Sequence, residues 1–383
     1  MGRFHDAWRR AAVIVTGLAA LSWATVGPAY AAGPAAGTVA AGYSHTCTIR
    51  ADATLWCWGG NESGQLGDGT TTGRTTPERI GADTWTTIDA GTSYTCGVRT
   101  DRTLWCWGSN RWGQLGDGST TNRTAPVPVG GGATWSSVAA GDSHTCAVRT
   151  DGTLWCWGFN RLGQLGIGTS VYYATSPVMV GTATTWASVT AGFAHTCAVR
   201  TDGTLWCWGD STTGQLGLGI LSYTATPAQV GTATTWTGVT AGYAFTCAVR
   251  SDGTLWCWGE NGYGQLGAET TYQTTPMQTG AGATWTRVAA GFNTTCATRA
   301  DGSLWCWGNN MAGQVGDGTT TNQYAPVRVG TATTWADGFA VTYHTCAART
   351  DGSLWCWGYN PAGQLGDGTA TSRPTPAPAS FPA

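Results

Sequence analysis

Lysine is absent from this chain of 383 residues, and charged residues of both signs make up only 10% of it. All 19 permanently basic side chains are therefore arginines. After the first 31 residues, which hold three of these arginines and one aspartate, 16 arginines face 20 acidic residues and no basic block occurs. Because nucleic-acid-binding proteins concentrate positive charge on one surface, this balance argues against nucleic acid as a partner.

Patterns that support membrane insertion or catalysis are also missing. Beyond the N-terminus, no segment is long and apolar enough to span a bilayer, so we expect no membrane contact. No Ser/His/Asp set, paired-carboxylate spacing or phosphate-binding loop stands out. We therefore predict that the protein is not an enzyme and needs no cofactor.

Metal-site patterns are equally weak. The short paired spacing C-x-x-C, which zinc favours, does not occur. Gly-Asp-Gly-Thr stretches resemble calcium loops, but each supplies a single carboxylate, and Ile167, Leu218 and Ala268 replace it in three copies. We expect no bound metal.

Glycine and tryptophan, in contrast, are abundant. The chain has 58 glycines and 23 tryptophans, and 42% of its residues are hydrophobic. Disordered chains are poor in aromatic residues, whereas turn-rich packed proteins combine the two. This composition predicts an ordered, all-β protein.

Residues 1–31 have the features of a secretory signal peptide. Three arginines precede an apolar stretch at residues 11–26, and the small-x-small sequence Ala-Tyr-Ala follows at residues 29–31. A transmembrane anchor is the alternative, but the apolar run is short and interrupted by polar residues and a Gly-Pro pair. We expect a secreted, extracellular protein of residues 32–383; the general and twin-arginine export routes both stay open.

One unit is repeated seven times. The block Thr-Leu-Trp-Cys-Trp-Gly, or a close variant, recurs about every 50 residues, and a second cysteine lies ten positions before the first in every copy. A period near 50 without helical periodicity is typical of a four-stranded propeller blade. We predict an all-β, seven-bladed β-propeller over residues 32–383, with four strands per blade. Its repeats should begin near residues 38, 86, 136, 187, 237, 286 and 336.

The third copy illustrates the expected strands. Residues 135–140, 144–149 and 153–157 are separated by short turns rich in glycine and aspartate, and a glycine-rich loop precedes each last strand. The N-terminal segment 37–41 matches a first strand, and the C-terminal segment 376–379 matches a last one. We expect these two terminal segments to pair with each other, which would close the ring and leave no free edge.

The repeat resembles that of the regulator-of-chromosome-condensation family. The shared frame is A-G-x-x-H-T-x-A-x-x-x-D-G-x-x-x-x-W-G-x-N-x-x-G-Q-L-G, and it covers essentially all of residues 38–379. This resemblance implies seven blades around a central channel. It does not imply one function, because the family includes a nuclear GTPase exchange factor, a plant UV-B photoreceptor and secreted bacterial propellers that inhibit β-lactamases. The expected export signal argues against the nuclear role.

Hairpin geometry pairs the two cysteines of each copy. A three-residue turn with Gly152 in the left-handed conformation makes Arg149 and Thr153 the closing pair. Counting back places Cys146 opposite Cys156 at a non-hydrogen-bonded position, where side chains approach most closely. Secretion supplies the oxidising compartment, so disulfides are favoured over metal ligands or free thiols. Each bridge closes a short loop and should stabilise the fold by at most about 2–3 kcal/mol. The predicted bridges are Cys47–Cys57, Cys96–Cys106, Cys146–Cys156, Cys197–Cys207, Cys247–Cys257, Cys296–Cys306 and Cys346–Cys356.

Two of these turns depart from the pattern. Ala53 and Arg102 stand where the other copies have glycine. A left-handed residue with a side chain should strain each of these turns by about 1 kcal/mol.

The repeated tryptophans and histidines are assigned structural roles. Trp155 and Trp157 share one face of their strand, and their recurrence in every copy favours filling of the gaps between blades over a photoreceptor-like cluster or stacking platforms. Histidine occupies one repeat position in four copies and is replaced by Tyr, Phe or Thr in the others. A structural histidine is therefore expected rather than a catalytic or metal-binding one. The four are His45, His144, His195 and His344.

One face of the propeller is predicted to bind a partner. Alternating strand directions place the A-G-x-x and W-G-x-N-x-x-G turns on one face and the nearly identical D-G turns on the other. The first turn carries, in chain order, Tyr43, Thr92, Asp142, Phe193, Tyr243, Phe292 and Thr342, and no tryptophan. Aromatic residues on varied loops over a rigid frame are typical of interface hot spots, with capping of the core as the alternative. The predicted binding residues are Tyr43, Phe193, Tyr243 and Phe292 in the first turn, Trp112, Phe159, Tyr263 and Tyr359 in the second, and Tyr172, Tyr173 and Tyr223 in the long loops.

These features predict a secreted, monomeric scaffold that binds an extracellular protein through this varied rim. The resemblance to secreted inhibitors points to an extracellular enzyme that binding would inhibit or regulate. The rival prediction is a non-catalytic propeller that binds carbohydrate, such as a cell-wall glycan. An enzyme accessory or purely structural protein is a third class. Flat paired aromatic rings near Asp or Asn would favour the sugar.

Overall fold

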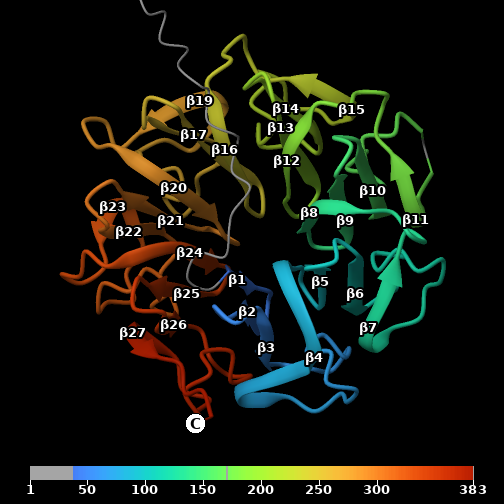
Figure 1. Cartoon of the computed structure of the whole chain (residues 1–383). Coiled ribbons are helices and arrows are strands. Elements are labelled where there is room, and N and C mark those ends of the chain that lie inside the picture. Colours follow the sequence, from blue (N-terminus) through green and yellow to red (C-terminus); the bar gives the residue numbers. More distant parts are fainter. Residues whose placement is uncertain (1–37, 170, 383) are drawn as a thin grey trace, which may run out of the picture. The chain divides into compact units, whose positions relative to one another are not determined.

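Each repeat folds into one blade of four antiparallel strands. The computed structural model describes residues 38–169 and 171–382, so the predicted signal peptide of residues 1–31 lies outside the described residues. Figure 1 shows the blades following one another around a common axis in sequence order, from β1 (Thr38–Ala41) to β27 (Arg373–Pro378). The prediction of an all-β, seven-bladed propeller is confirmed.

The strands are best described by their position in a blade, counted outward from the axis. The inner strands are β1, the last part of β4 (Arg74–Ala90), β8 (Trp135–Ala140), β12 (Trp186–Ala191), β16 (Trp236–Ala241), β20 (Trp285–Ala290) and β24 (Trp335–Val341). The second strands are β2 (His45–Ile49), β5 (Tyr94–Arg99), β9 (His144–Arg149), β13 (His195–Arg200), β17 (Phe245–Arg250), β21 (Thr294–Arg299) and β25 (His344–Arg349).

The remaining strands complete the blades on the outside. The third strands are β3 (Thr54–Gly59), β6 (Leu104–Gly108), β10 (Leu154–Phe159), β14 (Leu205–Gly209), β18 (Leu255–Glu260), β22 (Leu304–Gly308) and β26 (Leu354–Gly358). The outer strands are the first part of β4, β7 (Arg123–Val129), β11 (Tyr173–Met179), β15 (Thr224–Gln229), β19 (Tyr272–Thr279), β23 (Gln323–Arg328) and β27. Because β4 runs without a break from blade 1 into blade 2, these two blades share one seven-stranded sheet.

The predicted hairpin register is present in every blade. In blade 3, Cys146 lies opposite Cys156, and the Arg149 N–H donates to the Thr153 carbonyl at 2.9 Å. Gly152 has a φ of 79°, the left-handed conformation that the three-residue turn requires. All seven predicted disulfides form across this register with Cα–Cα distances of 4.1 Å, and the described residues include no free cysteine. Ala53 and Arg102 adopt φ values of 64° and 68°, so the predicted departures from glycine do occupy the left-handed region.

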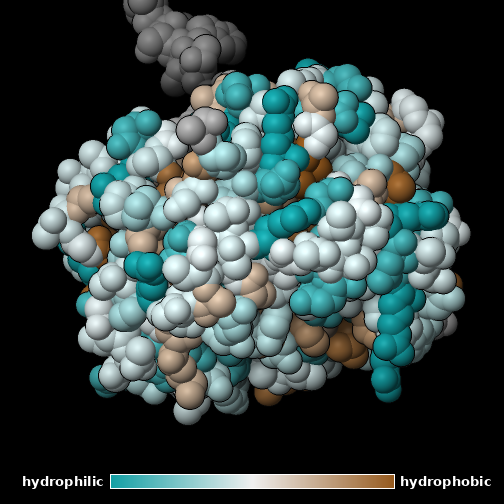
Figure 2. Space-filling view, turned by 90° about the horizontal axis from the view of Figure 1, so that it is seen from below, coloured by the Kyte–Doolittle hydropathy of each residue, from teal (hydrophilic) through white to brown (hydrophobic). Residues whose placement is uncertain are grey.

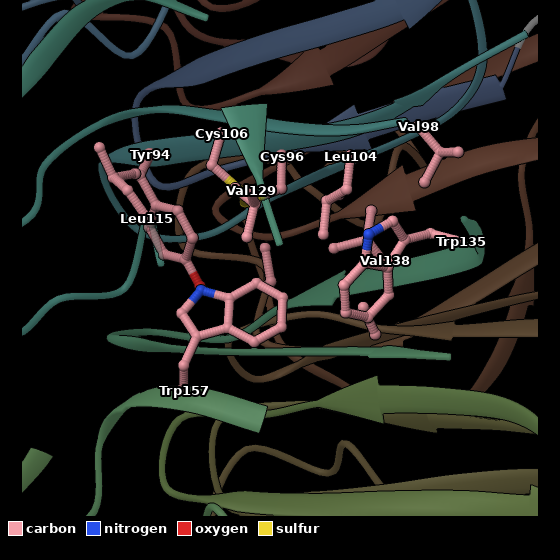
Figure 3. Packing of buried hydrophobic residues seen from close by; sticks show 12 residues of the cluster. Tyr94, Cys96, Val98, Leu104, Cys106, Leu115, Val129, Trp135, Val138 and Trp157 are labelled. Carbon is pink, nitrogen blue, oxygen red and sulfur yellow. A yellow bond between two sulfur atoms is a disulfide. The ribbon is translucent and has the colours of Figure 1, made fainter. Parts of the chain in front are cut away.

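The hydrophobic core lies between blades rather than within them. In Figure 3, Leu115 and Val129 of blade 2 gather with Trp135, Val138 and Trp157 of blade 3. The indole N–H of each such third-strand tryptophan reaches the preceding blade, as Trp157 does when it donates to the Gln114 carbonyl at 2.9 Å. The tryptophans therefore fill the gaps between blades, as the repetition predicts.

The prediction that the two terminal strands pair is wrong. β1 pairs with β2, and β27 pairs with β26 inside its own blade. The error lies in its premise, because an outer strand and the next inner strand, such as β7 and β8, belong to different sheets. Blade 7 instead packs its inner strand β24 against β1, and the Thr46 hydroxyl donates to the Gln364 carbonyl at 2.8 Å.

A side chain from the C-terminus completes this closure. Six blades begin their inner strand with a buried or nearly buried tryptophan, and in blade 3 Arg149 lies over both Trp135 and Trp155, at 5.0 and 3.8 Å from the ring centres. Blade 1 has Ala36 at this point of the repeat. Phe381 stands in for the missing ring: it lies 5.7 Å from Trp56, and Arg50 lies 5.1 Å from its centre. The ring is thus closed by packing of β24 against β1 together with the Phe381 side chain, and not by hydrogen-bonded pairing of the two terminal strands.

Seen from below the view of Figure 1, the outer side of the propeller is mostly hydrophilic or neutral (Figure 2). Hydrophobic residues appear there only in small, scattered groups. The part of the outer side in this view offers no broad apolar area of the kind that marks a large interface.

Candidate binding face

The antiparallel order of each blade divides its turns between two faces. We call the face with the turns between inner and second strands, and with the loops after the third strands, the variable face. The opposite face, with the turns between second and third strands, is the D-G face. The strand pairings of blade 3, with β8, β9, β10 and β11 all antiparallel in succession, give this division directly.

Five aromatic rings follow one another across the variable face. Successive ring centres are 4.4 Å apart for Phe193 and Tyr243, 4.3 Å for Tyr243 and Phe292, 4.5 Å for Phe292 and Tyr343, and 5.0 Å for Tyr343 and Tyr43. They come from the first turns of blades 4, 5, 6, 7 and 1. We call these five residues the aromatic arc. The structure thus brings together all four aromatic residues that the sequence placed in this turn.

The fifth member, Tyr343, was not predicted. The sequence frame placed Thr342 at the first-turn position of blade 7, whereas in the structure Tyr343 occupies it. In blade 3, Val138 pairs with Ala147, but in blade 7 the equivalent Ala347 pairs with Phe339, one residue later than the sequence frame predicts. An irregularity between Trp335 and Phe339 causes this slip. The following turn is shorter, and Tyr343 fills the place between its neighbours. The departure from A-G to Ala340-Val341 was the available signal.

Polar residues occupy the first turns of blades 2 and 3. The Thr92 hydroxyl donates to the Asp142 carboxylate at 2.5 Å, which links the two blades where the arc is interrupted. The arc is therefore one-sided, and the face has an aromatic portion and a polar portion.

Backbone contacts fix the spacing of the arc. The backbone amides of three arc residues donate to the first turn of the next blade: Tyr43 to the Thr92 carbonyl at 3.3 Å, Phe193 to the Gly242 carbonyl at 3.3 Å and Tyr243 to the Gly291 carbonyl at 3.1 Å. Glycine is required before Phe193, because a Cβ on Gly192 would lie 2.5 Å from the Gly242 oxygen. The rings are thus positioned by the ring of blades and not by flexible loops.

The second-turn residues divide between two places. Trp112 lies 5.0 Å from Phe159 and 5.6 Å from Tyr172 (ring centres), and Tyr173 adjoins it at 6.3 Å. We call these four residues the Trp112 cluster, and the Arg111 guanidinium lies 5.1 Å from the Trp112 ring.

Tyr263 and Tyr359 belong instead to the surroundings of the arc. Tyr359 lies 6.2 Å from Tyr343. Desolvation, followed by the nearby phenols of Tyr43, Tyr243, Tyr263 and Tyr359, raises the pKa of Tyr343 to about 12. Tyr343 is therefore a neutral hydrogen-bond donor and acceptor at physiological pH.

Several predicted residues are accessible to a partner. Tyr43 and Phe193, at the two ends of the arc, are 43% and 41% exposed, and Tyr172, Tyr173 and Tyr223 are exposed as well. Tyr243, Phe292, Trp112, Phe159, Tyr263 and Tyr359 are half-buried. Tyr272, which the sequence reasoning missed, is exposed at the place in blade 5 that Tyr173 holds in blade 3.

The loops under the aromatic residues are held by a buried asparagine. In blade 2, the Asn110 amide donates to the Ser119 and Thr121 carbonyls at 3.1 Å each, and its oxygen accepts from the Leu115 N–H at 3.0 Å. The Asp117 carboxylate accepts from the Ser119 hydroxyl at 2.8 Å. The Gly-Asp-Gly stretch is therefore a loop support.

The histidines lie inside the scaffold, below the variable face. The Thr95 hydroxyl donates to the Gln65 carbonyl at 2.8 Å, so its oxygen accepts the Nε2–H of His45 at 2.9 Å. His144, His195 and His344 bond the next blade's threonine in the same way. Burial lowers the pKa of each imidazole to about 3. Neutral rings in these positions join adjacent blades and have no access to a ligand.

Two kinds of feature are absent from the described residues. Within residues 38–169 and 171–382, no three His, Cys, Asp or Glu side chains come together as a metal site would require. Over the same part of the chain, no helix has the length and apolar character to cross a membrane.

The fold is shared with solved structures of low sequence identity. Human WBSCR16 is 21% identical, with 86% of this chain and 94% of that chain covered and a TM-score of 0.77. Prp20p from Saccharomyces cerevisiae is 20% identical, with 85% of each chain covered and a TM-score of 0.76. The CRINKLY WD40 ectodomain of the Arabidopsis thaliana receptor kinase ACR4 is 21% identical, with 89% and 98% covered and a TM-score of 0.54. At such identities the likeness shows the fold alone.

The sequence itself matches a repeat family, although no curated protein matches the chain as a whole. One form of the regulator of chromosome condensation (RCC1) repeat matches residues 38–65, 85–114, 135–164, 186–215, 236–265, 285–314 and 339–364. Another form matches residues 52–98, 102–148, 151–199, 202–249, 252–298 and 301–348. The first set covers more than half of the chain, with each match lying within one blade, whereas each match of the second set runs from one blade into the next. The protein therefore belongs to the regulator of chromosome condensation (RCC1) repeat family.

Proposed function

We propose that this propeller is a secreted, non-catalytic recognition protein that binds an extracellular protein through its variable face. The observation that carries the proposal is the aromatic arc, five rings in mutual contact on one face of a rigid frame. Aromatic residues bury large areas at little entropic cost and dominate protein interfaces. The polar side of the face, at Thr92 and Asp142, would form part of the rim.

The geometry of the rings favours a protein over a glycan. Their planes are tilted by 41°, 32° and 33° from Phe193 to Tyr343, so each ring covers part of the face of the next. A sugar stacks on a flat exposed ring, whereas a protein surface packs against edges and faces together. The arc therefore fits the apolar core of a protein interface better than a set of sugar platforms.

Secretion is supported by the covalent structure and by the predicted signal peptide. Seven disulfides indicate an oxidising compartment. One solved propeller of this fold, Prp20p (yeast RCC1), is described with partners: its binding properties to Gsp1p and histones in one structure, and Kap60 bound to it in another. An extracellular enzyme that is inhibited on binding is the partner class we favour.

The test is capture of a partner from culture supernatant on the immobilised protein, followed by affinity measurement. Phe193→Ala with Tyr243→Ala should weaken binding by at least about 2 kcal/mol, roughly 30-fold, because both rings lie in the arc. Thr182→Ala with Thr232→Ala, exposed threonines on the D-G side of the same blades, is the matched control and should bind normally. Stronger loss in the control pair, or none in the arc pair, would assign binding elsewhere.

The captured protein also tests the finer proposal. If it is an enzyme, adding the propeller to its activity assay should lower its turnover in proportion to the complex formed. Capture of a polysaccharide in place of a protein would replace the proposal with the glycan alternative.

A further inference from the structure

A groove opens beside the aromatic arc, between blades 6 and 7. It has a volume of about 480 Å³, and all nine residues that line it are uncharged. Tyr343, Tyr359, Met311 and Pro374 are the large apolar and aromatic residues among them. Met311 is 72% exposed at its edge. Because Tyr343 belongs to both features, the groove continues the arc toward the outer strands.

Two polar residues of the groove, Asn309 and Gln314, bond each other and the backbone between them. Gln314 accepts from the Ala312 N–H at 2.9 Å and donates to the Asn309 side chain at 3.0 Å, and the same Asn309 oxygen accepts from the Met311 N–H at 3.0 Å. The Gln314 amide and the Asn309 oxygen are already engaged, so the groove favours an apolar group over a ligand rich in hydroxyls.

The repeat shows what fills this space elsewhere in the same chain. Ala312 and Trp112 hold the same position, since each backbone N–H donates to the glutamine two residues later at 2.9 Å. Tyr359 and Phe159 are likewise equivalent, as the amide of each donates to the carbonyl 16 residues before it, at 3.1 and 2.9 Å. Between blades 2 and 3 an indole ring therefore occupies the place that Ala312 leaves open between blades 6 and 7.

The surroundings of the two places explain why a ring suits both. Trp112 packs 5.0 Å from Phe159 and stays half-buried. The groove offers Tyr359 in place of Phe159 and adds Tyr343 from the neighbouring turn. Uncharged walls with two phenol rings match an uncharged aromatic side chain, which gains both buried area and ring–ring contacts.

We propose that this groove receives an aromatic side chain, with tryptophan the best fit, presented by the protein partner. The inference rests on the proposed function in one respect, the assignment of the ring to a protein. The groove would then act as the anchor pocket of the interface, next to the flat contact made by the arc.

The experiment uses a probe, so that it needs no identified partner. N-acetyl-tryptophanamide is titrated into protein labelled with 13C at its methionine methyl groups; Met311 is one of only four methionines in the chain. A ring that enters the groove should shift the Met311 methyl signal upfield, with a dissociation constant in the millimolar range. N-acetyl-leucinamide should shift it far less at the same concentration, and N-acetylglucosamine should leave it in place.

Two variants separate the groove from non-specific stacking. Ala312→Trp copies Trp112 and fills the groove from within, so probe affinity should fall at least about tenfold. Ala362→Trp adds the same ring at the same turn position of blade 7 and should keep affinity within about twofold. A Met311 signal that does not move, that moves equally in Ala312→Trp, or that responds better to N-acetylglucosamine would overturn the proposal.

The outcomes for the groove and for the proposed function are distinguishable. If the arc variants leave partner capture unchanged, the proposed function is refuted. The probe titration still reports on the groove in that case. If the arc variants lose the partner and the probe does not bind, the proposed function stands and the groove is not an anchor site.

Discussion

The two faces of the propeller are built from the same repeat and differ in what they tolerate. On the D-G face, every blade repeats one chain of contacts: in blade 3 the Thr153 hydroxyl donates to Asp151 at 2.6 Å, and the Trp155 indole donates to Thr153 at 2.9 Å. The Thr153 hydrogen bond lowers the pKa of Asp151, and Arg149 lies over the Trp155 ring at 3.8 Å. On the variable face, the residue after the A-G of the first turn is Phe, Tyr, Thr or Asp, depending on the blade.

This difference shows how one repeat can provide both a frame and a site. Contacts that recur in all seven blades stabilise the ring, so a substitution there should lower stability. Positions that differ among blades are free of that demand, and the aromatic arc and the groove lie among them. Variation within one chain thus separates the frame from the candidate site without any second sequence.

The largest expected effect concerns the buried histidines just below the variable face, and tests whether residues at that depth contribute to stability. The four buried histidines have pKa values of about 3 in the folded protein, against about 6.5 in the unfolded chain. Between these values the unfolded chain binds more protons, so stability is full above pH 6.5 and is lost as the pH falls. Each histidine should lower the free energy of unfolding by about 1.4 kcal/mol for every pH unit below 6.5. Urea unfolding at a series of pH values from 7.5 to 5 measures this loss.

One carboxyl opposes this trend, and one blade supplies the control. Desolvation raises the pKa of Asp89 to about 6, so the folded protein binds its proton first and gains stability from it as the pH falls toward 4. That single group offsets only part of the loss from four histidines.

His195→Phe copies Phe245 of blade 5 and should remove about 2 kcal/mol of the loss at pH 5. An unchanged pH dependence in this variant would mean that His195 already titrates normally in the folded state.

The next effect concerns the place where the repeat is incomplete on the D-G side of blade 1. Phe381→Ala should lower the free energy of unfolding by about 2 kcal/mol, because the ring that replaces the missing tryptophan is lost. Phe381→Trp restores the residue type of the other six blades and should retain stability. Thermal and urea unfolding of the two variants give the comparison. Equal stability of Phe381→Ala and the parent would show that contacts of β1 with β24 close the ring unaided.

Local and distant features of the structure differ in how far the sequence predicts them. The Cys146–Cys156 register depends on a turn of three residues, so counting from Gly152 is sufficient, and the same count holds in every blade. The four aromatic residues of the first turn follow from the same register. Tyr343 does not, because a slip in β24 depends on how that strand packs against its neighbours.

Ring closure and the groove lay beyond sequence reasoning for a related reason. The match of Phe381 to the missing tryptophan joins residues more than 300 positions apart, with no motif at the C-terminus to announce it. The groove exists because the side chain of Ala312 is small. That an aromatic ring would fit there is evident only from the packing of Trp112 against Phe159 at the equivalent place in the structure. Periodicity predicts what recurs, whereas these features are departures from it.

The smallest expected effect tests the uniformity of the D-G face itself. Ala53 and Arg102 hold left-handed conformations, which cost a residue with a side chain about 1–2 kcal/mol of folding free energy. Replacing them with glycine removes this strain, but glycine also loses more conformational entropy on folding, which offsets part of the gain. Ala53→Gly and Arg102→Gly should therefore each raise the free energy of unfolding by about 0.5–1 kcal/mol. Gly352→Ala should lower it by a similar amount through backbone strain alone, because a Cβ there meets no atom within 4 Å. Gly152→Ala should lose more, since its Cβ would lie 2.2 Å from the Thr184 oxygen. If Gly352→Ala and Gly152→Ala were equally stable, the D-G turns would be flexible enough to move aside, and the rigid face assumed in the comparison would not exist.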